Sequence, residues 1–240
     1  MIRRLVLFDI DGTILLTADA GRRAIVAALA DEVGDTAAFG TIRFDGKTDP
    51  QIVAEMLAAA GQHEPCESPR VRALCDRYVG LLARELERPT TSTTLMPGVR
   101  PLLDRLEREP GVVLGLLTGN LADAAALKLR SGGIAPERFR VGAYGSDAGH
   151  RPELPSIAAR RAEPIFGRIP HGAEVVIIGD TPADVACGTA IDARALAVAT
   201  GAYSVADLSA CGPHAVFEDL SETEAVVEAI LAPSLRSGPG

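Results

Sequence analysis

Short runs of continuously apolar residues alternate along the chain with segments in which apolar side chains recur at helical spacing. The runs at 2–8, 112–117, 174–178 and 195–199 predict buried parallel strands, and weaker strands are expected near 139–141 and 215–217. Helical segments lie at 99–109, 122–130, 156–163, 183–190 and 222–231. Strands that alternate with helices favour an α/β fold, here a Rossmann-like, doubly wound parallel sheet with helices on both faces.

The interval from about residue 15 to residue 95 breaks this alternation. Its helical segments, 21–33, 50–60 and 69–86, are rich in Ala, Leu and Arg, with no strand of comparable quality between them. An all-helical insertion directly after the first strand predicts a separate lid domain. We therefore expect an α/β core formed by residues 1–15 and 96–232, a helical cap over 16–95, and a disordered tail over 233–240.

The composition indicates a folded chain with an acidic surface. Of the 240 residues, 47% are hydrophobic and 23% are charged, which excludes extensive disorder. The formal net charge of −8, without a basic cluster, argues against nucleic acid and anionic membranes as partners. No apolar stretch reaches the roughly 18 residues of a membrane span. We expect a cytoplasmic, enzyme-sized protein, and its oligomeric state stays open.

Two carboxylates, Asp9 and Asp11, follow the first predicted strand directly. The carboxyl ends of strands are where open α/β sheets bind ligands, and carboxylate oxygens suit hard cations such as Mg²⁺. Gly12 allows the turn that brings backbone N–H groups toward an anion. The alternative is an acidic loop whose carboxylates are merely solvated.

Two more strand ends carry polar residues. Thr118, Gly119 and Asn120 follow the second strong strand, where a hydroxyl and backbone N–H groups would face the same crevice, although the same residues also suit an ordinary helix start. Asp180 follows the next strand and could complete a metal site with Asp9. Asp184 lies one helical turn later. It could orient a cation, or it could simply interact with the helix dipole in the first turn.

Phosphate chemistry at this edge also needs positive charge. Arg151 lies in a predicted loop before a helix, whereas Lys128 lies in the second turn of a helix that we expect to point away from the crevice, so we favour Arg151. In the insertion, Arg43 and Lys47 flank a Gly-containing turn and could bind a second anionic group of a substrate. The alternative there is a plain turn that opens a helix at Asp49.

Together, DIDGT, LLTGN, the Arg-Pro loop at Arg151 and GDTPAD resemble the haloacid dehalogenase superfamily of phosphohydrolases. The helical insertion is similar to the cap of its phosphoglycolate phosphatases and β-phosphoglucomutases. One residue departs from the family pattern, because the family usually has Lys where this chain has Arg151. Arg can bind phosphate through two hydrogen bonds but does not reproduce the geometry of a compact ammonium.

The resemblance implies roles for individual residues. Asp9 would be the nucleophile that forms an aspartyl-phosphate, and Asp11 the acid and then the base. Mg²⁺ would be held by Asp9, by the main-chain carbonyl of Asp11 and by Asp180. The phosphoryl oxygens would be bound by Thr118, Arg151 and the N–H groups of Ile10, Asp11 and Gly119, with Asn120 beside them and with Gly12, Thr13 and Asp184 in support.

These expectations favour a Mg²⁺-dependent phosphatase that acts on a small phosphorylated metabolite, similar to phosphoglycolate or a sugar phosphate. A dehalogenase of the same superfamily needs neither the metal nor the second aspartate. A phosphomutase would share every core residue and therefore stays open as an alternative. A metabolite-binding protein without catalysis is the third hypothesis.

Overall fold

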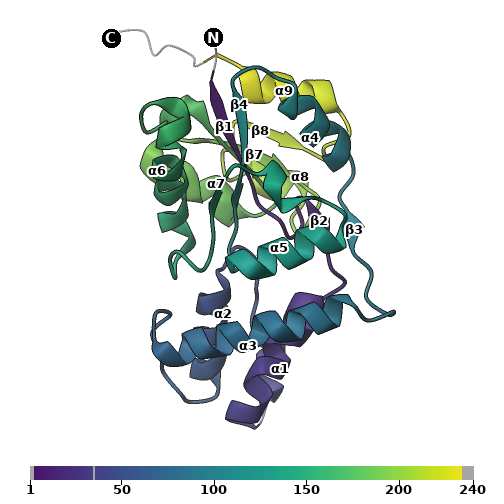
Figure 1. The fold of residues 1–240 in the computed structure, drawn as a ribbon, viewed down its shortest axis with the longest axis vertical. Coiled ribbons are helices and arrows are strands. Elements are labelled where there is room, and N and C mark those ends of the chain that lie inside the picture. Colours follow the sequence, from purple (N-terminus) through teal and green to yellow (C-terminus); the bar gives the residue numbers. More distant parts are fainter. Residues whose placement is uncertain (1–2, 35, 234–240) are drawn as a thin grey trace.

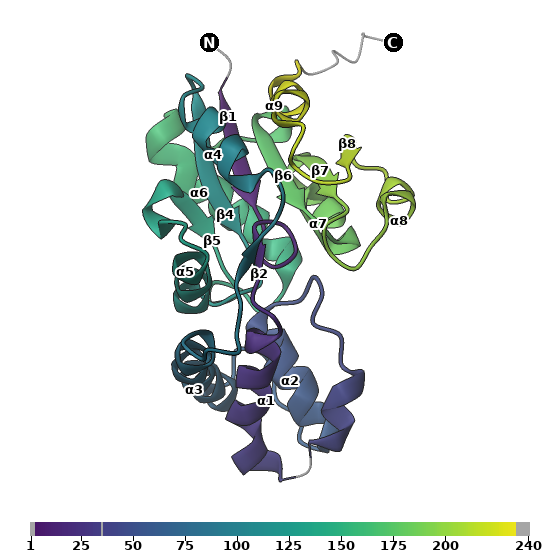
Figure 2. The ribbon, with the colours of Figure 1, turned by 90° about the vertical axis from the view of Figure 1, so that its right-hand side faces the viewer.

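The computed structural model describes residues 3–34 and 36–233. A parallel sheet covered by helices forms one end of the molecule, and the helices of the insertion form the other (Figures 1 and 2). This arrangement confirms the predicted fold class. Most of the predicted tail, residues 234–240, lies outside the described residues. Within them, no helix is long and apolar enough to cross a bilayer.

The larger sheet has six parallel strands in the order β5-β4-β1-β6-β7-β8. Their bounds are β1 Arg4–Phe8, β4 Val112–Leu117, β5 Val141–Ala143, β6 Val175–Gly179, β7 Arg194–Val198 and β8 Ala215–Phe217. Every predicted strand is present, and the boundaries differ from the expected ones by at most two residues. The predicted strands are therefore confirmed as elements, with small shifts at their ends.

The strand order places the carboxyl ends of three strands side by side. From β1 the chain continues through β4 and β5 on one side and then crosses back to β6, β7 and β8 on the other. Phe8 pairs with Leu116 of β4 and with Ile178 of β6, so the residues just beyond these three strands come level with one another. This is the switch point at which open parallel sheets bind ligands.

Alternate side chains of β1 enter two separate apolar layers. Val6 and Phe8 face one layer, and Leu5 and Leu7 face the other; all four are fully buried. The first layer is completed by α4 (Val99–Glu107), α5 (Ala122–Ser131) and α9 (Thr223–Leu231), and the second by α6 (Leu154–Phe166) and α7 (Pro182–Cys187). Both faces of the sheet are thus covered, as expected for a doubly wound fold.

Shorter elements complete the core. The helix α8 (Val205–Ser209), which the sequence pattern did not predict, begins with a capping box in which Ser204 and Asp207 exchange hydrogen bonds. The 3-10 helices span Ala37–Thr41, Pro136–Arg138, Arg151–Glu153, Gly172–Glu174 and Gly188–Ile191. The α-helix predicted over 183–190 ends as α7 at Cys187, and the 3-10 helix Gly188–Ile191 replaces its final residues.

The insertion consists of α1 (Ala20–Val33), α2 (Asp49–Ala59) and α3 (Pro69–Leu86) around their own apolar cluster. Hydroxyl side chains fix two of the helix starts: Thr48 accepts the N–H of Gln51, and Ser68 accepts the N–H of Val71. A proline in the first turn follows each cap. Local sequence therefore explains why α2 and α3 begin where they do.

A two-stranded antiparallel ribbon joins the insertion to the sheet domain. It consists of β2 (Leu15–Leu16) and β3 (Thr94–Leu95), neither of which the sequence pattern predicted. Two residues per strand carry too little alternation to be recognised. The predicted limits of the cap at residues 16 and 95 fall on this ribbon, and the division into domains stays a prediction.

Gly98 offers a test of the packing of the core. It precedes α4 with a φ of 78°, and a Cβ there would overlap the backbone of Leu220. We expect Gly98→Ala to lower the free energy of unfolding by at least about 2 kcal/mol, because the left-handed backbone and the close approach both exclude a methyl group. Urea unfolding measures the change.

Gly80 provides the matched control. It lies within α3, and apart from the backbone of α3 itself no heavy atom of the described residues would lie within 4 Å of an added Cβ. Gly80→Ala should raise the free energy of unfolding by about 0.5–1 kcal/mol, because alanine favours a helix interior over glycine. Equal stability of Gly98→Ala and the wild type would contradict the packing described here.

Candidate active site

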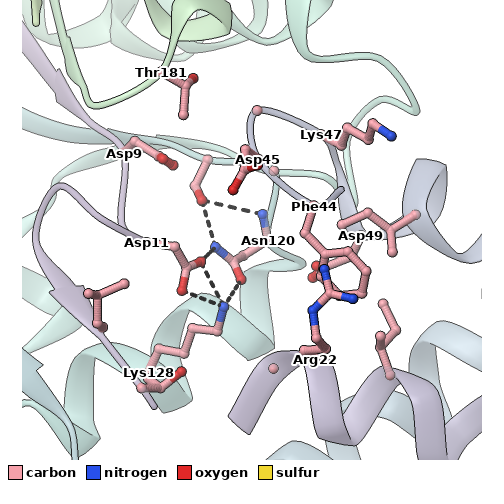
Figure 3. Close-up of a pocket in the computed structure, with 18 of the residues that line it drawn as sticks. Asp9, Asp11, Arg22, Phe44, Asp45, Lys47, Asp49, Asn120, Lys128 and Thr181 are labelled. Atoms are coloured by element: carbon pink, nitrogen blue, oxygen red, sulfur yellow. Dashed lines mark hydrogen bonds and ion pairs between the residues drawn. The ribbon is translucent and has the colours of Figure 1, made fainter. Parts of the chain in front are cut away.

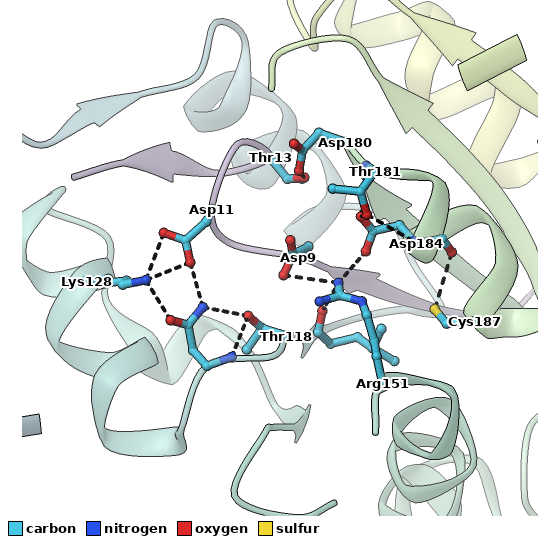
Figure 4. Close-up of polar contacts among 12 residues, drawn as sticks. Asp9, Asp11, Thr13, Thr118, Lys128, Arg151, Asp180, Thr181, Asp184 and Cys187 are labelled. Atoms are coloured by element: carbon cyan, nitrogen blue, oxygen red, sulfur yellow. Dashed lines mark hydrogen bonds and ion pairs between the residues drawn. The ribbon is translucent and has the colours of Figure 1, made fainter. Parts of the chain in front are cut away.

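A cavity of about 240 Å³ lies between the switch point of the sheet and the helices of the insertion. Asp9 and Asp11 reach it from the end of β1, Thr118 from the end of β4, and Asp180 from the end of β6 (Figure 4). The structure therefore brings together the polar residues predicted at the three strand ends. Their proximity follows from the strand order, because β1 lies between β4 and β6.

The turn after β1 packs directly against Asp180. Gly12 adopts a φ of 84°, and a Cβ at this position would overlap the Asp180 carboxylate. Thr13 donates a hydrogen bond from its hydroxyl to Asp180 Oδ1 over 3.0 Å. Position 12 therefore requires glycine for two reasons, its positive φ and the close approach of the Asp180 carboxylate.

Three buried carboxylates form an acidic cluster. Ligand oxygens of Asp9, Asp180 and Asp184 all lie within 4.8 Å of one another. Burial, reinforced by the neighbouring carboxylates, raises the pKa of Asp9 to about 6 and that of Asp180 to about 8. Each additional negative charge in this cluster is therefore costly unless a cation compensates it.

Arg151 is the cation at the centre of this cluster. Its side chain is buried, and its Nη2 lies 3.2 Å from Asp9 Oδ1 and also bonds Asp184 Oδ1. Among the described residues, its Nε has no hydrogen-bond partner. Arg151 therefore lies in the site, as the sequence predicts, and neutralises part of the buried negative charge.

Lys128 also lies in the site, so the expectation that it points away from the crevice is wrong. Its Nζ donates to both oxygens of Asp11 over 2.9 and 2.7 Å, and to Asn120 Oδ1 over 2.7 Å (Figures 3 and 4). Helical side chains lean toward the N-terminus of their helix. The long Lys128 side chain thereby reaches back to the start of α5, which is where the cavity lies.

Thr118 and Asn120 link the end of β4 to Asp11. Asn120 Nδ2 donates to Asp11 Oδ2 over 2.7 Å and to Thr118 Oγ1 over 2.8 Å. A Cβ at Gly119 would overlap the backbone carbonyl of Lys47, so the insertion lies directly against this segment. The side-chain network fixes the orientation of the Asp11 carboxylate at the cavity wall.

Asp184 uses one carboxylate oxygen to cap α7 and the other to pair with Arg151. Its Oδ2 accepts hydrogen bonds from the Thr181 N–H over 3.0 Å and from the Thr181 hydroxyl over 2.6 Å, which caps α7. Its Oδ1 pairs with Arg151. Because both oxygens are engaged, Asp184 supports the cluster from behind.

The acidic cluster fits a small hard dication. Asp180 Oδ2 accepts no hydrogen bond from the described residues, and Asp9 adds a second carboxylate that faces the cavity. An all-oxygen donor set of this kind suits Mg²⁺. We infer that Asp9 and Asp180 are the side chains that would hold such an ion.

The two cations predicted in the insertion have other partners. Arg43 pairs with Asp45 over 2.9 Å and donates to the Tyr203 hydroxyl over 3.3 Å, outside the wall of the cavity. Lys47 lines the cavity, but its ammonium bonds Glu55. The structure therefore does not bring the Arg43 charge to the cavity wall.

Among the residues of the insertion that line the cavity, sequence reasoning did not single out Arg22 and Tyr78, and it interpreted Asp49 only as the start of a helix. They come from three different helices, α1, α2 and α3. Each fits the ordinary pattern of its helix, so no local signal distinguishes it. Only the packing of the insertion against α5 turns these side chains toward the strand ends.

The fold and the site define an α/β protein in which carboxylates at the strand ends line a cavity against a helical insertion. The chain belongs to the haloacid dehalogenase-like hydrolase family, whose model matches residues 3–192. A phosphoglycolate phosphatase from Cereibacter sphaeroides is 28% identical over 232 residues, which cover 95% of this chain and 99% of the relative.

Solved structures show the same fold. CbbY from Rhodobacter sphaeroides in complex with phosphate matches with a TM-score of 0.69 and 19% identity, over 92% of this chain and 96% of that one. A predicted phosphoglycolate phosphatase from Haemophilus somnus 129pt matches with a TM-score of 0.67 and 16% identity, over 95% and 99% of the two chains.

Replacing Arg151 tests how much the acidic cluster depends on it. We expect Arg151→Met to lower the free energy of unfolding by about 3–5 kcal/mol, because it leaves buried carboxylates without a cation. The control is Arg161→Met, which breaks an exposed ion pair with Asp147 and should cost no more than about 1 kcal/mol. Urea unfolding without divalent metal measures both. An Arg151→Met protein as stable as the control would contradict this prediction.

Proposed function

We propose that this hydrolase is a Mg²⁺-dependent phosphatase that cleaves a small phosphate monoester through an aspartyl-phosphate on Asp9. The observation that carries the proposal is the placement of Asp9 at the end of β1, in the cavity, with Arg151 on one of its oxygens and Asp11 two residues later. The phosphoglycolate phosphatases among its relatives support the same chemistry.

In the first step, a carboxylate oxygen of Asp9 attacks phosphorus, and the bond from phosphorus to the alcohol oxygen breaks. Burial raises the pKa of Asp9, whereas the neighbouring Arg151 guanidinium favours its ionised form, which is the form that acts as a nucleophile. Arg151 orients the attacking carboxylate and offers positive charge to the phosphoryl oxygens. Bound Mg²⁺ would supply further charge neutralisation at the same oxygens.

Asp11 is the residue placed to move protons in both steps. Its side chain is 41% exposed toward the cavity, whereas Lys128, which holds it, is 6% exposed. In the first step Asp11 donates a proton to the leaving alcohol oxygen. In the second step it accepts a proton from the water that attacks phosphorus, and the bond from Asp9 to phosphorus breaks.

The dimensions of the cavity favour a small substrate. A volume of about 240 Å³ lies below the roughly 300–1,000 Å³ of sites for drug-sized ligands. Residues of the insertion line the side of this cavity that faces the strand ends. We therefore propose a phosphoglycolate-like or small sugar-phosphate-like substrate.

The first test of this function is phosphate release from a panel of small phosphate monoesters. We expect turnover with Mg²⁺, no turnover with EDTA, and a loss of at least about 10³-fold in Asp9→Asn, because an amide is not a nucleophile toward phosphorus. Asp104→Asn, an exposed carboxylate on α4, should keep full activity. Turnover that survives Asp9→Asn would contradict the mechanism, and isomerisation without phosphate release would indicate a phosphomutase.

Metal binding can be tested separately from catalysis. We expect Mg²⁺ to raise the thermal unfolding midpoint of the wild-type protein, because ligands that bind only the folded state stabilise it. Asp180→Asn should abolish that rise, whereas Asp123→Asn, an exposed carboxylate on α5, should keep it. Titration calorimetry with MgCl₂ provides a second readout. Unchanged Mg²⁺ binding in Asp180→Asn would refute the assignment.

A further inference from the structure

The cationic residues that line the cavity differ in one respect. Three of them are paired with carboxylates: Lys47 with Glu55, Lys128 with Asp11, and Arg151 with Asp9 and Asp184. Arg22, from the first turn of α1, also lines the cavity and has no carboxylate partner within the described residues. It is therefore a candidate for a charge that the ligand itself neutralises.

The Arg22 guanidinium is held in place by uncharged groups. Its Nη2 donates to the Ile42 carbonyl over 2.8 Å, and its Cζ lies 4.0 Å from the centre of the Phe44 ring. A guanidinium has five N–H donors in a planar fork, and only one of them is used here. Stacking fixes that plane, so the free edge is preorganised for bidentate contact with a carboxylate or phosphate.

The geometry leaves a path from Asp11 to Arg22. Gly21 lies between them in the cavity wall, and a Cβ at this position would lie 3.4 Å from Lys128 Nζ and 3.7 Å from the Tyr78 hydroxyl. In Figure 3, Arg22 rises from α1 toward Phe44, apart from the group formed by Asp11 and Lys128. A short leaving group bound at Asp11 would therefore extend past Gly21 toward Arg22.

Polar oxygen atoms of Tyr78 and Asp49 lie beside this path. Tyr78 is 1% exposed and lines the cavity, and its hydroxyl has no hydrogen-bond partner among the described residues. Asp49 uses Oδ2 to accept the Leu121 N–H over 2.8 Å, while Oδ1 has no donor in the described part of the chain. These atoms could bind a hydroxyl or a protonated oxygen of the leaving group.

The carboxylates on this side of the cavity do not neutralise the positive charge of Arg22. Asp45 is paired with Arg43, and Asp49 is tied to the start of α5. Asp19 also lines the cavity, but it is exposed at the beginning of α1, where water and salt screen its charge. Among the cationic side chains that line the cavity, Arg22 is the one without a carboxylate partner in the described part of the chain.

We propose that Arg22 binds a second anionic group, a carboxylate or a phosphate, at the far end of the leaving group. The substrate class is then a small phosphate monoester whose alcohol carries a negative charge, rather than a neutral sugar monophosphate. This inference rests on the proposed function and names its substrate more narrowly. It also places selectivity on α1, not on the cations of the 43–49 turn.

Three esters with the same two-carbon skeleton test the proposal: 2-phosphoglycolate, ethylene glycol bisphosphate and 2-hydroxyethyl phosphate, whose alcohol carries no charge. For the wild type we expect kcat/KM to be at least about tenfold higher for one or both of the doubly anionic esters, because charge-assisted hydrogen bonds discriminate by that order. A preference for the first ester identifies a carboxylate, and a preference for the second identifies a phosphate.

Variants assign the preference to a residue. Arg22→Gln should reduce the ratio of anionic to neutral kcat/KM to about one, and Arg22→Lys should restore part of it. Arg23→Gln, which removes the neighbouring cation and its exposed pair with Glu85, should keep the wild-type ratio. Circular dichroism and urea unfolding establish that each variant folds.

Two outcomes would overturn the inference: a wild type without preference for the anionic esters, or a preference that Arg22→Gln retains. If Lys47→Gln rather than Arg22→Gln abolished the preference, the second anion would bind the 43–49 turn instead. Absence of phosphate release from every ester would refute the proposed function itself, which is a separate result.

Discussion

Asp9, Asp180 and Asp184 are buried within 4.8 Å of one another, where burial and mutual repulsion disfavour their charged forms. The structure compensates this arrangement at close range. Arg151 pairs with two of the three carboxylates, and Thr13 donates to the third. These contacts of Arg151 and Thr13 follow from the need to compensate the buried negative charges. Arg151 neutralises only part of the negative charge of the three carboxylates. A bound dication would compensate the remaining charge, and an anionic substrate could then bind beside it.

The same constraint connects stability with function. A buried cluster that raises the pKa of Asp9 to about 6 and that of Asp180 to about 8 makes the metal-free protein less stable than a neutral core would. Binding of a cation would release that cost, so ligand affinity and folding stability draw on the same interaction. A site prepared in this way requires little rearrangement when the substrate arrives.

The helix α5 contacts the insertion, the sheet and the side chain of Asp11. Leu121 and Ala124 pack into the apolar cluster of the insertion, whereas Ala125 and Leu129 pack onto the sheet. Lys128, one turn after Ala124, donates to Asp11 at the cavity wall. The same helix therefore contacts the insertion, the sheet and, through Lys128, the side chain of Asp11.

The sequence by itself determined the parallel sheet and the strand-end aspartates, because buried strands are short apolar runs and their carboxyl ends meet at one edge. It also placed Arg151 in the site. It offered Lys128 only as a rival of Arg151 that points away, and it did not reveal Arg22, because the direction of a long helical side chain depends on what that helix packs against. It likewise missed the two-residue strands β2 and β3, which depend on pairing with each other. Tertiary structure decided which cations face the cavity and which already have partners, because pairing such as that of Lys47 with Glu55 is set by distances in space.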